Sequence, residues 1–169
     1  MNVIRLAARW KFSPDSENTG VQQEWFAQSY DDSSWDSCRT DLEKGWESQG
    51  YSIDSGYGWY RQQIELPAGL TAKHIYIYFG AVDEDAWVYI NGKLSLDHSC
   101  EATGMTPEQI WDEPFVFDAA KDIVQGQKNT LAVRVHNSSK MGGIWQPVYL
   151  VVSDSELDLA DVQSVAIKN

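Results

Sequence analysis

Short runs of alternating apolar and polar residues, separated by turn-forming residues, recur along the chain. In the run from Trp59 to Leu66, the even-numbered residues are mostly apolar and the odd-numbered residues from Arg61 onward are polar, which is the period of a strand with one buried face. The run from Ile75 to Phe79 is β-branched and aromatic throughout, as is typical of a central strand. Further strands are predicted at residues 4–12, 87–90, 93–96, 115–117, 130–136 and 148–152.

Turn signals and the scarcity of helical periods define the fold class. The pair Asn91-Gly92 lies between two apolar runs and predicts a tight hairpin, because both residues tolerate positive φ. Single helical turns are expected at most at residues 22–30 and 119–124. Many short strands with little helix predict an all-β fold, a two-sheet antiparallel β-sandwich.

The pattern divides the chain into a sandwich and a tail. Residues 1–153 carry the predicted strands and form one β-sandwich domain in this interpretation. The tail, residues 154–169, is more acidic and alternates weakly at Val162, Val165 and Ile167. It is predicted to be either a closing strand or a linker to a further domain.

Three longer loops interrupt the strands, at residues 47–57, 97–114 and 137–146, and each carries aromatic residues. Long loops on a rigid scaffold are common binding positions. We therefore expect these loops to cluster at one end of the sandwich.

Composition and charge exclude several classes of function. The 169 residues include 13 Lys and Arg against 25 Asp and Glu, for a net charge of −12. This balance argues against nucleic acid or an anionic membrane as the main partner. The sequence has no apolar run long enough to span a membrane, and its first residues lack the pattern of a signal peptide. We expect the parent protein to be extracellular, periplasmic or on the cell surface.

Aromatic residues in polar loops suggest carbohydrate binding. Indole and phenol faces pack against the apolar C–H face of a sugar ring, and neighbouring polar side chains bind its hydroxyls. Of the eight Trp residues, five are interpreted as core, namely Trp10, Trp25, Trp35, Trp46 and Trp87. Trp59 begins a strand and is interpreted as mostly core as well. The candidate carbohydrate-binding residues are Tyr57, Trp59, Glu84, Asp85, Trp111, His136, Asn137, Lys140 and Trp145.

Other chemistry has weaker signals. The carboxylate run Asp83-Glu84-Asp85 is compatible with acid–base catalysis, but a solvated turn or a ligand-contacting turn explains it better. The oxygen-rich loop with Asp15, Glu17 and Asn18 is a candidate structural Ca²⁺ site, although an ordinary turn explains it better. No other cofactor is indicated. Cys38 and Cys100 either pair or remain free thiols.

An ordered set of motifs resembles the sugar-binding domain of family 2 glycoside hydrolases. The set spans residues 9–152 and consists of Trp10-Lys11-Phe12, Gly58-Trp59-Tyr60-Arg61, Phe79-Gly80-Ala81-Val82-Asp83-Glu84, Val88-Tyr89-Ile90-Asn91-Gly92-Lys93, Pro114 to Asp118, Gly126 to Val135, and Gly142-Gly143-Ile144-Trp145-Gln146-Pro147-Val148. The resemblance implies a galactose-binding-like jelly roll, normally attached to a catalytic barrel. It also implies that loops 52–58 and 137–145 reach toward that barrel. The catalytic carboxylates of the family lie in the barrel, so the resemblance assigns none to this chain.

These observations lead to a primary hypothesis and two alternatives. The first is a non-catalytic carbohydrate-binding module that targets a larger glycoside hydrolase to an oligo- or polysaccharide. The acidic balance of the chain favours a neutral glycan. The alternative is a structural accessory domain that packs on the catalytic domain of the same parent chain and has no sugar affinity of its own. A small enzyme that uses paired loop carboxylates is the third.

Overall fold

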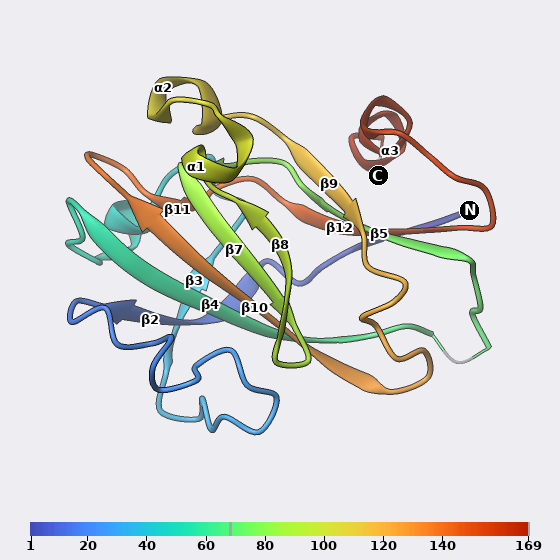
Figure 1. Cartoon of the computed structure of the whole chain (residues 1–169), viewed down its shortest axis with the longest axis horizontal. Helices are drawn as coiled ribbons and strands as arrows, with labels where there is room; N and C mark the ends of the chain where they lie inside the picture. The colour runs from blue at the N-terminus through green and yellow to red at the C-terminus, as the bar shows by residue number, and fades with distance from the viewer. Residues whose placement is uncertain (68, 169) are drawn as a thin grey trace.

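Two antiparallel sheets form a sandwich in the computed structural model, which describes residues 1–67 and 69–168 (Figure 1). The four-stranded sheet has the order β1 (Asn2–Arg5), β12 (Val148–Ser153), β5 (His74–Phe79) and β9 (Phe115–Asp118). The six-stranded sheet has the order β3 (Asp36–Arg39), β2 (Arg9–Asp15), β4 (Gly56–Glu65), β10 (Lys128–Asn137), β7 (Asp85–Ile90) and β8 (Lys93–His98). The prediction of an antiparallel β-sandwich is confirmed.

Short elements complete the fold at its ends. The strands β6 (Val82–Asp83) and β11 (Gly143–Ile144) pair with each other. The helical elements are η1 (Trp46–Gln49), α1 (Cys100–Thr103), α2 (Pro107–Ile110) and α3 (Leu159–Ala166). No helix among the described residues has the length and apolar character needed to cross a membrane.

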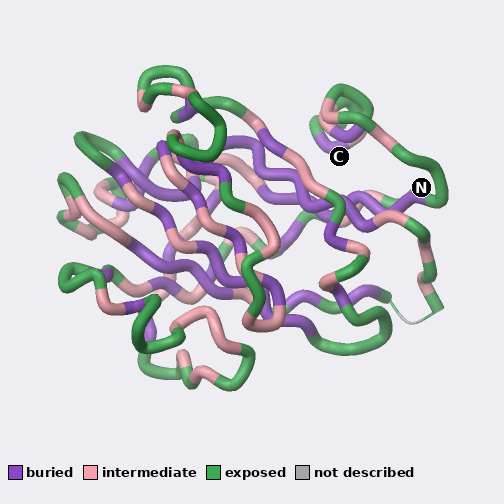
Figure 2. Tube along the Cα trace, viewed as in Figure 1, coloured by how far each residue is buried: buried purple, intermediate pink, exposed green. Residues whose placement is uncertain are grey.

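The core lies between the two sheets, where the strands are buried along most of their length (Figure 2). Tyr60, Ile64 and Leu66 of the predicted alternating run point into it, as its period requires. The hairpin at Asn91 and Gly92 is also confirmed, with φ of 51° and 85° at its two central residues. Local sequence therefore determines these elements correctly.

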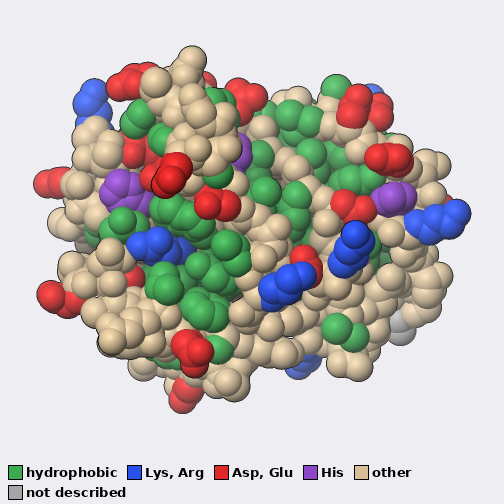
Figure 3. All heavy atoms as spheres, viewed as in Figure 1, with side chains coloured by type: hydrophobic (Ala, Val, Ile, Leu, Met, Phe, Trp, Pro, Cys, Tyr) green, Lys and Arg blue, Asp and Glu red, His purple; other side chains and the backbone are tan. Residues whose placement is uncertain are grey.

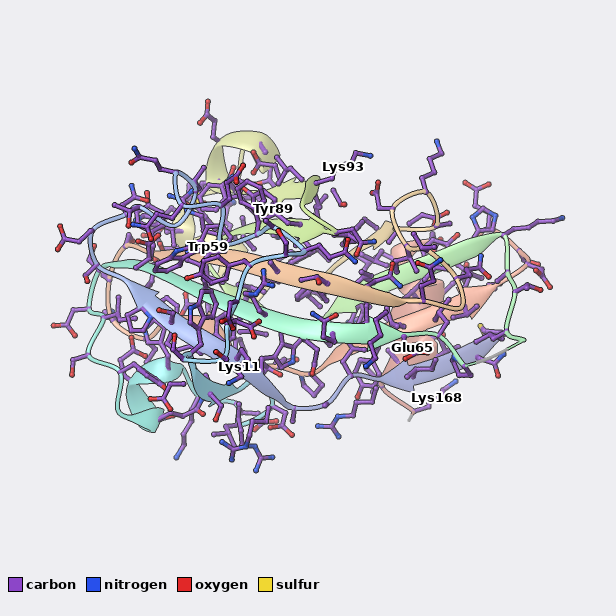
Figure 4. The ribbon with its side chains drawn as sticks, turned by 90° about the horizontal axis from the view of Figure 1, so that it is seen from below. Lys11, Trp59, Glu65, Tyr89, Lys93 and Lys168 are labelled. Atoms are coloured by element: carbon purple, nitrogen blue, oxygen red, sulfur yellow. The ribbon has the colours of Figure 1, made fainter. Side chains whose placement is uncertain are left out.

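The outer face of the six-stranded sheet is partly covered by the loop of residues 16–35. Trp59 and Tyr89 lie side by side beneath this loop with ring centroids 5.7 Å apart (Figure 4). The Arg61 guanidinium, 1% exposed, donates to the carbonyl oxygens of Trp25 and Ala27 at 2.6 and 3.1 Å, and to the Asp32 carboxylate at 2.8 Å. One buried cation thus holds the loop on the sheet.

Two sequence expectations differ from the structure. The predicted strand at 4–12 is two strands, β1 and β2, which belong to different sheets because the chain crosses from one layer to the other between them. The tail contains α3 and not a closing strand, and Asp158 caps this helix by accepting from the Asp161 N–H at 2.8 Å. Val162 and Ala166 pack on the outer face of the four-stranded sheet. Asn169, the last residue of the predicted tail, lies outside the described residues.

The two cysteines are free thiols. Cys38 is buried beside the Tyr60 hydroxyl, at 3.8 Å from sulfur to oxygen. Burial raises the pKa of both thiols to about 11, despite a lowering contribution from the Tyr60 hydrogen bond at Cys38. Neither thiol is therefore activated as a nucleophile at neutral pH.

The buried Arg61 provides a stability test. Arg61→Met is expected to lower the free energy of unfolding by about 3 kcal/mol, because it leaves buried carbonyl groups without a donor and breaks the ion pair with Asp32. The matched control is Arg39→Met, since Arg39 forms an exposed ion pair with Asp41 and its loss should cost less than about 1 kcal/mol. Urea denaturation of both variants measures the difference, and equal losses would contradict the role given to Arg61.

Candidate functional site

Two tryptophans bring two of the long loops together. Trp111, at the end of α2, stacks on Trp145 with ring centroids 5.6 Å apart and an interplanar angle of 15°. The Trp145 indole N–H also donates to the Trp111 carbonyl oxygen at 3.2 Å. The loops at 97–114 and 137–146 meet at the end of the sandwich where η1 also lies (Figure 1). The predicted clustering of the long loops is confirmed there, and we call this surface the loop end.

Each carboxylate of the run 83–85 has a different environment. Glu84 has a positive φ of 65° and is buried, and its two oxygens accept from the N–H and hydroxyl of Ser138 at 2.7 and 2.8 Å. Asp85 accepts from the Cys100 N–H at 2.6 Å and lies 3.1 Å from His136 Nδ1. Glu84 and Asp85 therefore anchor the two long loops to the sheet.

Asp83 differs from its neighbours because it faces the loop-end surface. Burial, followed by repulsion from Glu84 and Glu47, raises the pKa of Asp83 to about 7. Burial also acts to raise the pKa of Asp85, but the hydrogen bonds with His136 and Cys100 outweigh it and hold that pKa below its ordinary value. The pKa values of Asp83 and Asp85 are thus shifted in opposite directions, and of these two groups Asp83 is the one that titrates near neutrality.

Two neighbouring open pockets lie beside this carboxyl group. One has a volume of about 420 Å³ and the other about 450 Å³, and Asp83, Trp111 and Met141 line both. The first is completed by Glu84, Pro107, Glu108 and Ser138 to Lys140, and the second by Glu43 to Gly45, Trp145 and Gln146. The loop end thus combines apolar side chains with hydrogen-bonding groups. Met141 and Asp83 were not among the candidate binding residues, since neither has an aromatic signal.

Three of the predicted carbohydrate-binding residues are buried and hold the scaffold. Trp59 is 0% exposed and its indole N–H donates to Asp15 Oδ2 at 2.9 Å. Asn137 is also 0% exposed and its side-chain amide donates to the Lys140 carbonyl oxygen at 3.2 Å. Glu84 is bound to Ser138 as described above. Trp59 and Asn137 have no exposed surface with which to contact a ligand, so the prediction is corrected for these two. Glu84 still lines the first pocket, and its contact with a ligand stays a prediction.

Tyr57 and His136 lie apart from the tryptophan pair. They occupy opposed positions of β4 and β10 on the outer face of the six-stranded sheet, with ring centroids 4.6 Å apart. The Arg134 guanidinium carbon lies 4.0 Å from the Tyr57 ring centroid and 4.6 Å from the Trp87 ring centroid. Trp87 was expected in the core but is partly exposed here, and hydrophobic side chains gather on this face (Figure 3). Arg134 has no signal of its own in the sequence, because its partners come from neighbouring strands.

The candidate calcium loop uses its carboxylate internally. Asp15 accepts from the N–H groups of Thr19 and Gly20 at 2.8 and 3.0 Å, in addition to Trp59. The Asn18 side-chain oxygen accepts from Arg134 at 2.7 Å. Among residues 1–67 and 69–168, no group of three or more His, Cys, Asp and Glu is placed to hold a metal ion. A calcium ion at Asp15, Glu17 and Asn18 stays a prediction that this geometry does not support.

Comparison with known proteins identifies the family. Residues 30–141, about two thirds of the chain, match the family described as the beta-galactosidase second all-beta domain, and the chain belongs to this family. It is 33% identical over 82 residues to a beta-glucuronidase of Formosa agariphila, a match that covers 48% of this chain and 7% of that protein.

Solved structures share the same fold. Ruminococcus gnavus beta-glucuronidase aligns with a TM-score of 0.72 and 18% identity, covering 90% of this chain and 29% of that one. Bacteroides uniformis beta-glucuronidase aligns with a TM-score of 0.68 and 25% identity, covering 88% and 17%. The chain thus spans less than a third of these relatives. It is a small non-catalytic domain that matches one part of larger glycoside hydrolases.

The raised pKa of Asp83 gives a stability test. The folded state binds more protons than the unfolded state between pH 4 and about 7, so Asp83 makes the free energy of unfolding fall as the pH rises through that window. Asp83→Asn should remove this fall and stabilise the domain at pH 8 by on the order of 1 kcal/mol.

Denaturation curves at pH 5 and pH 8 measure the effect, with Asp154→Asn at an exposed position as the matched control for net charge. A wild-type pH dependence that persists unchanged in Asp83→Asn would show that Asp83 is not the group responsible.

Proposed function

We propose that the chain is an accessory domain that packs, through its loop end, on the catalytic domain of a β-glucuronidase-like glycoside hydrolase. The carrying observation is the rigid apolar surface that Trp111 and Met141 present, at 40% and 53% exposure. Exposed apolar side chains that adjoin each other mark interaction sites, and Trp and Met are enriched in protein interfaces. The coverage of each relative by this chain supports the same role, because most of each relative lies outside the match.

The surroundings of this surface suit a buried interface. The stack on Trp145 fixes the Trp111 ring before docking, which reduces the entropy lost on association. Glu84 is already satisfied by Ser138, so burying the loop end leaves that carboxylate paired. Asp83, with its pKa near 7, can become neutral on burial at little cost.

Hydrogen exchange tests the docking. Amides of residues 107–112 and 138–145 should exchange more slowly in the full-length parent protein than in the isolated chain, since docking would cover them. Trp111→Ala in the parent should remove this protection. Leu94→Ala is the matched control, because Leu94 is equally exposed but lies on β8 at the outer sheet face. Equal exchange of these amides in the parent and in the isolated chain contradicts the proposal.

A carbohydrate-binding role is the second candidate, and the 420 Å³ pocket favours it. One face of Trp111 is taken by Trp145, but the ring remains 40% exposed beside Asp83, Ser138 and Lys140. A flat apolar ring next to carboxylate, hydroxyl and ammonium groups is the chemistry that a sugar requires. In this role the chain would act as a carbohydrate-binding module that brings its parent enzyme to a polysaccharide.

A glycan array with the isolated chain separates the two candidates. Binding that falls at least about tenfold in Trp111→Ala supports the carbohydrate-binding module, because a lost stacking platform costs about 1.4 kcal/mol or more. Leu94→Ala again serves as the exposed control. If no glycan gives a signal, the docking role remains as the only candidate of the two.

Two finer assignments belong with this proposal. The antiparallel strand order supports a galactose-binding-like jelly roll as the specific type of sandwich. A parent enzyme that acts on polysaccharides would work outside the cytoplasm, which is the location we propose for it.

A further inference from the structure

We propose that a third, larger pocket, at the rim of the six-stranded sheet, binds a neutral oligosaccharide on the ring of Tyr57. This pocket has a volume of about 850 Å³ and lies between residues 14–18 and residues 50–57. Its size is in the range of sites that hold organic ligands of several rings. It shares no lining residue with the two loop-end pockets, so the inference does not depend on the docking role.

Contacts with Arg134 and His136 hold the Tyr57 ring in place. The Arg134 guanidinium lies 4.0 Å from its centroid and 4.6 Å from that of Trp87, so the cation is stacked between two rings. The Arg134 side chain also donates to Asn18 Oδ1 at 2.7 Å, and the His136 ring packs on Tyr57 at 4.6 Å between centroids. A ring held by these contacts loses little freedom when a ligand stacks on it, which favours binding.

The pocket walls offer both parts of a sugar site. Tyr57, Tyr51 and Ile53 give apolar surface, and all three are partly exposed. Tyr51 is itself fixed, since its hydroxyl donates to the Ser37 carbonyl oxygen at 3.2 Å and its ring packs edge-on against Phe12 at 4.6 Å. The groups available to sugar hydroxyls are the exposed side chains of Ser16, Asn18, Ser52, Asp54 and Ser55.

The charge of the pocket selects a neutral ligand. Asp54 is an exposed carboxylate in the lining, whereas Asp15 is buried with its oxygens already paired. No Lys or Arg is among the lining residues, and the nearby Arg134 is already engaged by the Tyr57 ring and by Asn18 Oδ1. A uronate or sulfate group would meet Asp54 without a facing cation, so like-charge repulsion disfavours acidic glycans.

Titrations of the isolated ¹⁵N-labelled chain with cellotetraose, xylotetraose, β-1,4-galactotetraose and tetragalacturonate test this site. At least one neutral tetrasaccharide should shift the amide resonances of residues 52–57, and tetragalacturonate should bind more weakly. Tyr57→Ala should weaken that binding at least about tenfold, whereas Tyr57→Phe should retain it, because the ring face and not the hydroxyl makes the contact.

Control variants separate this site from the loop end. Leu94→Ala, at an exposed position of β8, should leave the affinity unchanged, and Arg134→Met should weaken it by loosening the Tyr57 ring. Thermal unfolding of each variant confirms that it is folded. The proposal is overturned if no neutral probe shifts residues 52–57 at millimolar concentration, if Tyr57→Ala binds as the wild type does, or if binding depends on Trp111 instead. Failure of docking at the loop end would leave these results unaffected.

Discussion

The antiparallel pairing of β4 with β10 is the constraint on which the rest of the structure depends. It runs without a break from Lys128 opposite Glu65 to Asn137 opposite Gly56, in the centre of the six-stranded sheet. This register places the rings and cations of the outer face opposite one another. It also fixes where the segment before β4, which lines the 850 Å³ pocket, and the segment after β10, which lines the loop end, leave the sheet. A shift of one residue would turn every side chain of β10 to the other face, so the two candidate sites have a common origin.

Electrostatics at the loop end follow from the same scaffold. The carboxylates of Glu84 and Asp85 bind Ser138 and Cys100 and hold the long loops on the sheet. The same packing buries Asp83, and this burial, with repulsion from Glu84 and Glu47, raises the pKa of Asp83. Loop anchoring and the raised pKa of Asp83 therefore share Glu84, which binds Ser138 and repels Asp83.

The sequence predicted what local chemistry decides. Asn91 and Gly92 made the hairpin visible because their φ preferences act within four residues, and Trp111 stood out because it lies in a long polar loop. The cover that residues 16–35 place over Trp59 was not predictable, since it depends on this loop folding back over the sheet. The contact between Tyr57 and Arg134 likewise joins strands far apart in sequence. Asn137 is the last residue of β10, where the alternating pattern cannot decide whether a side chain is buried or exposed. Predictions thus failed where tertiary packing sets exposure.

The edges of the two large sheets are poorly suited to pairing with further strands. In the part of the chain that the structure describes, three of the four edge strands of these sheets, β1, β3 and β9, span only four residues each. The fourth, β8, has an irregular register against Val88 and Tyr89 and carries the charges of Lys93 and Asp97. Short, bulged or charged edges are poor templates for added strands. Neither large sheet therefore offers a second copy of the chain a long, flat edge to extend, and this protects the domain against edge-to-edge polymerisation.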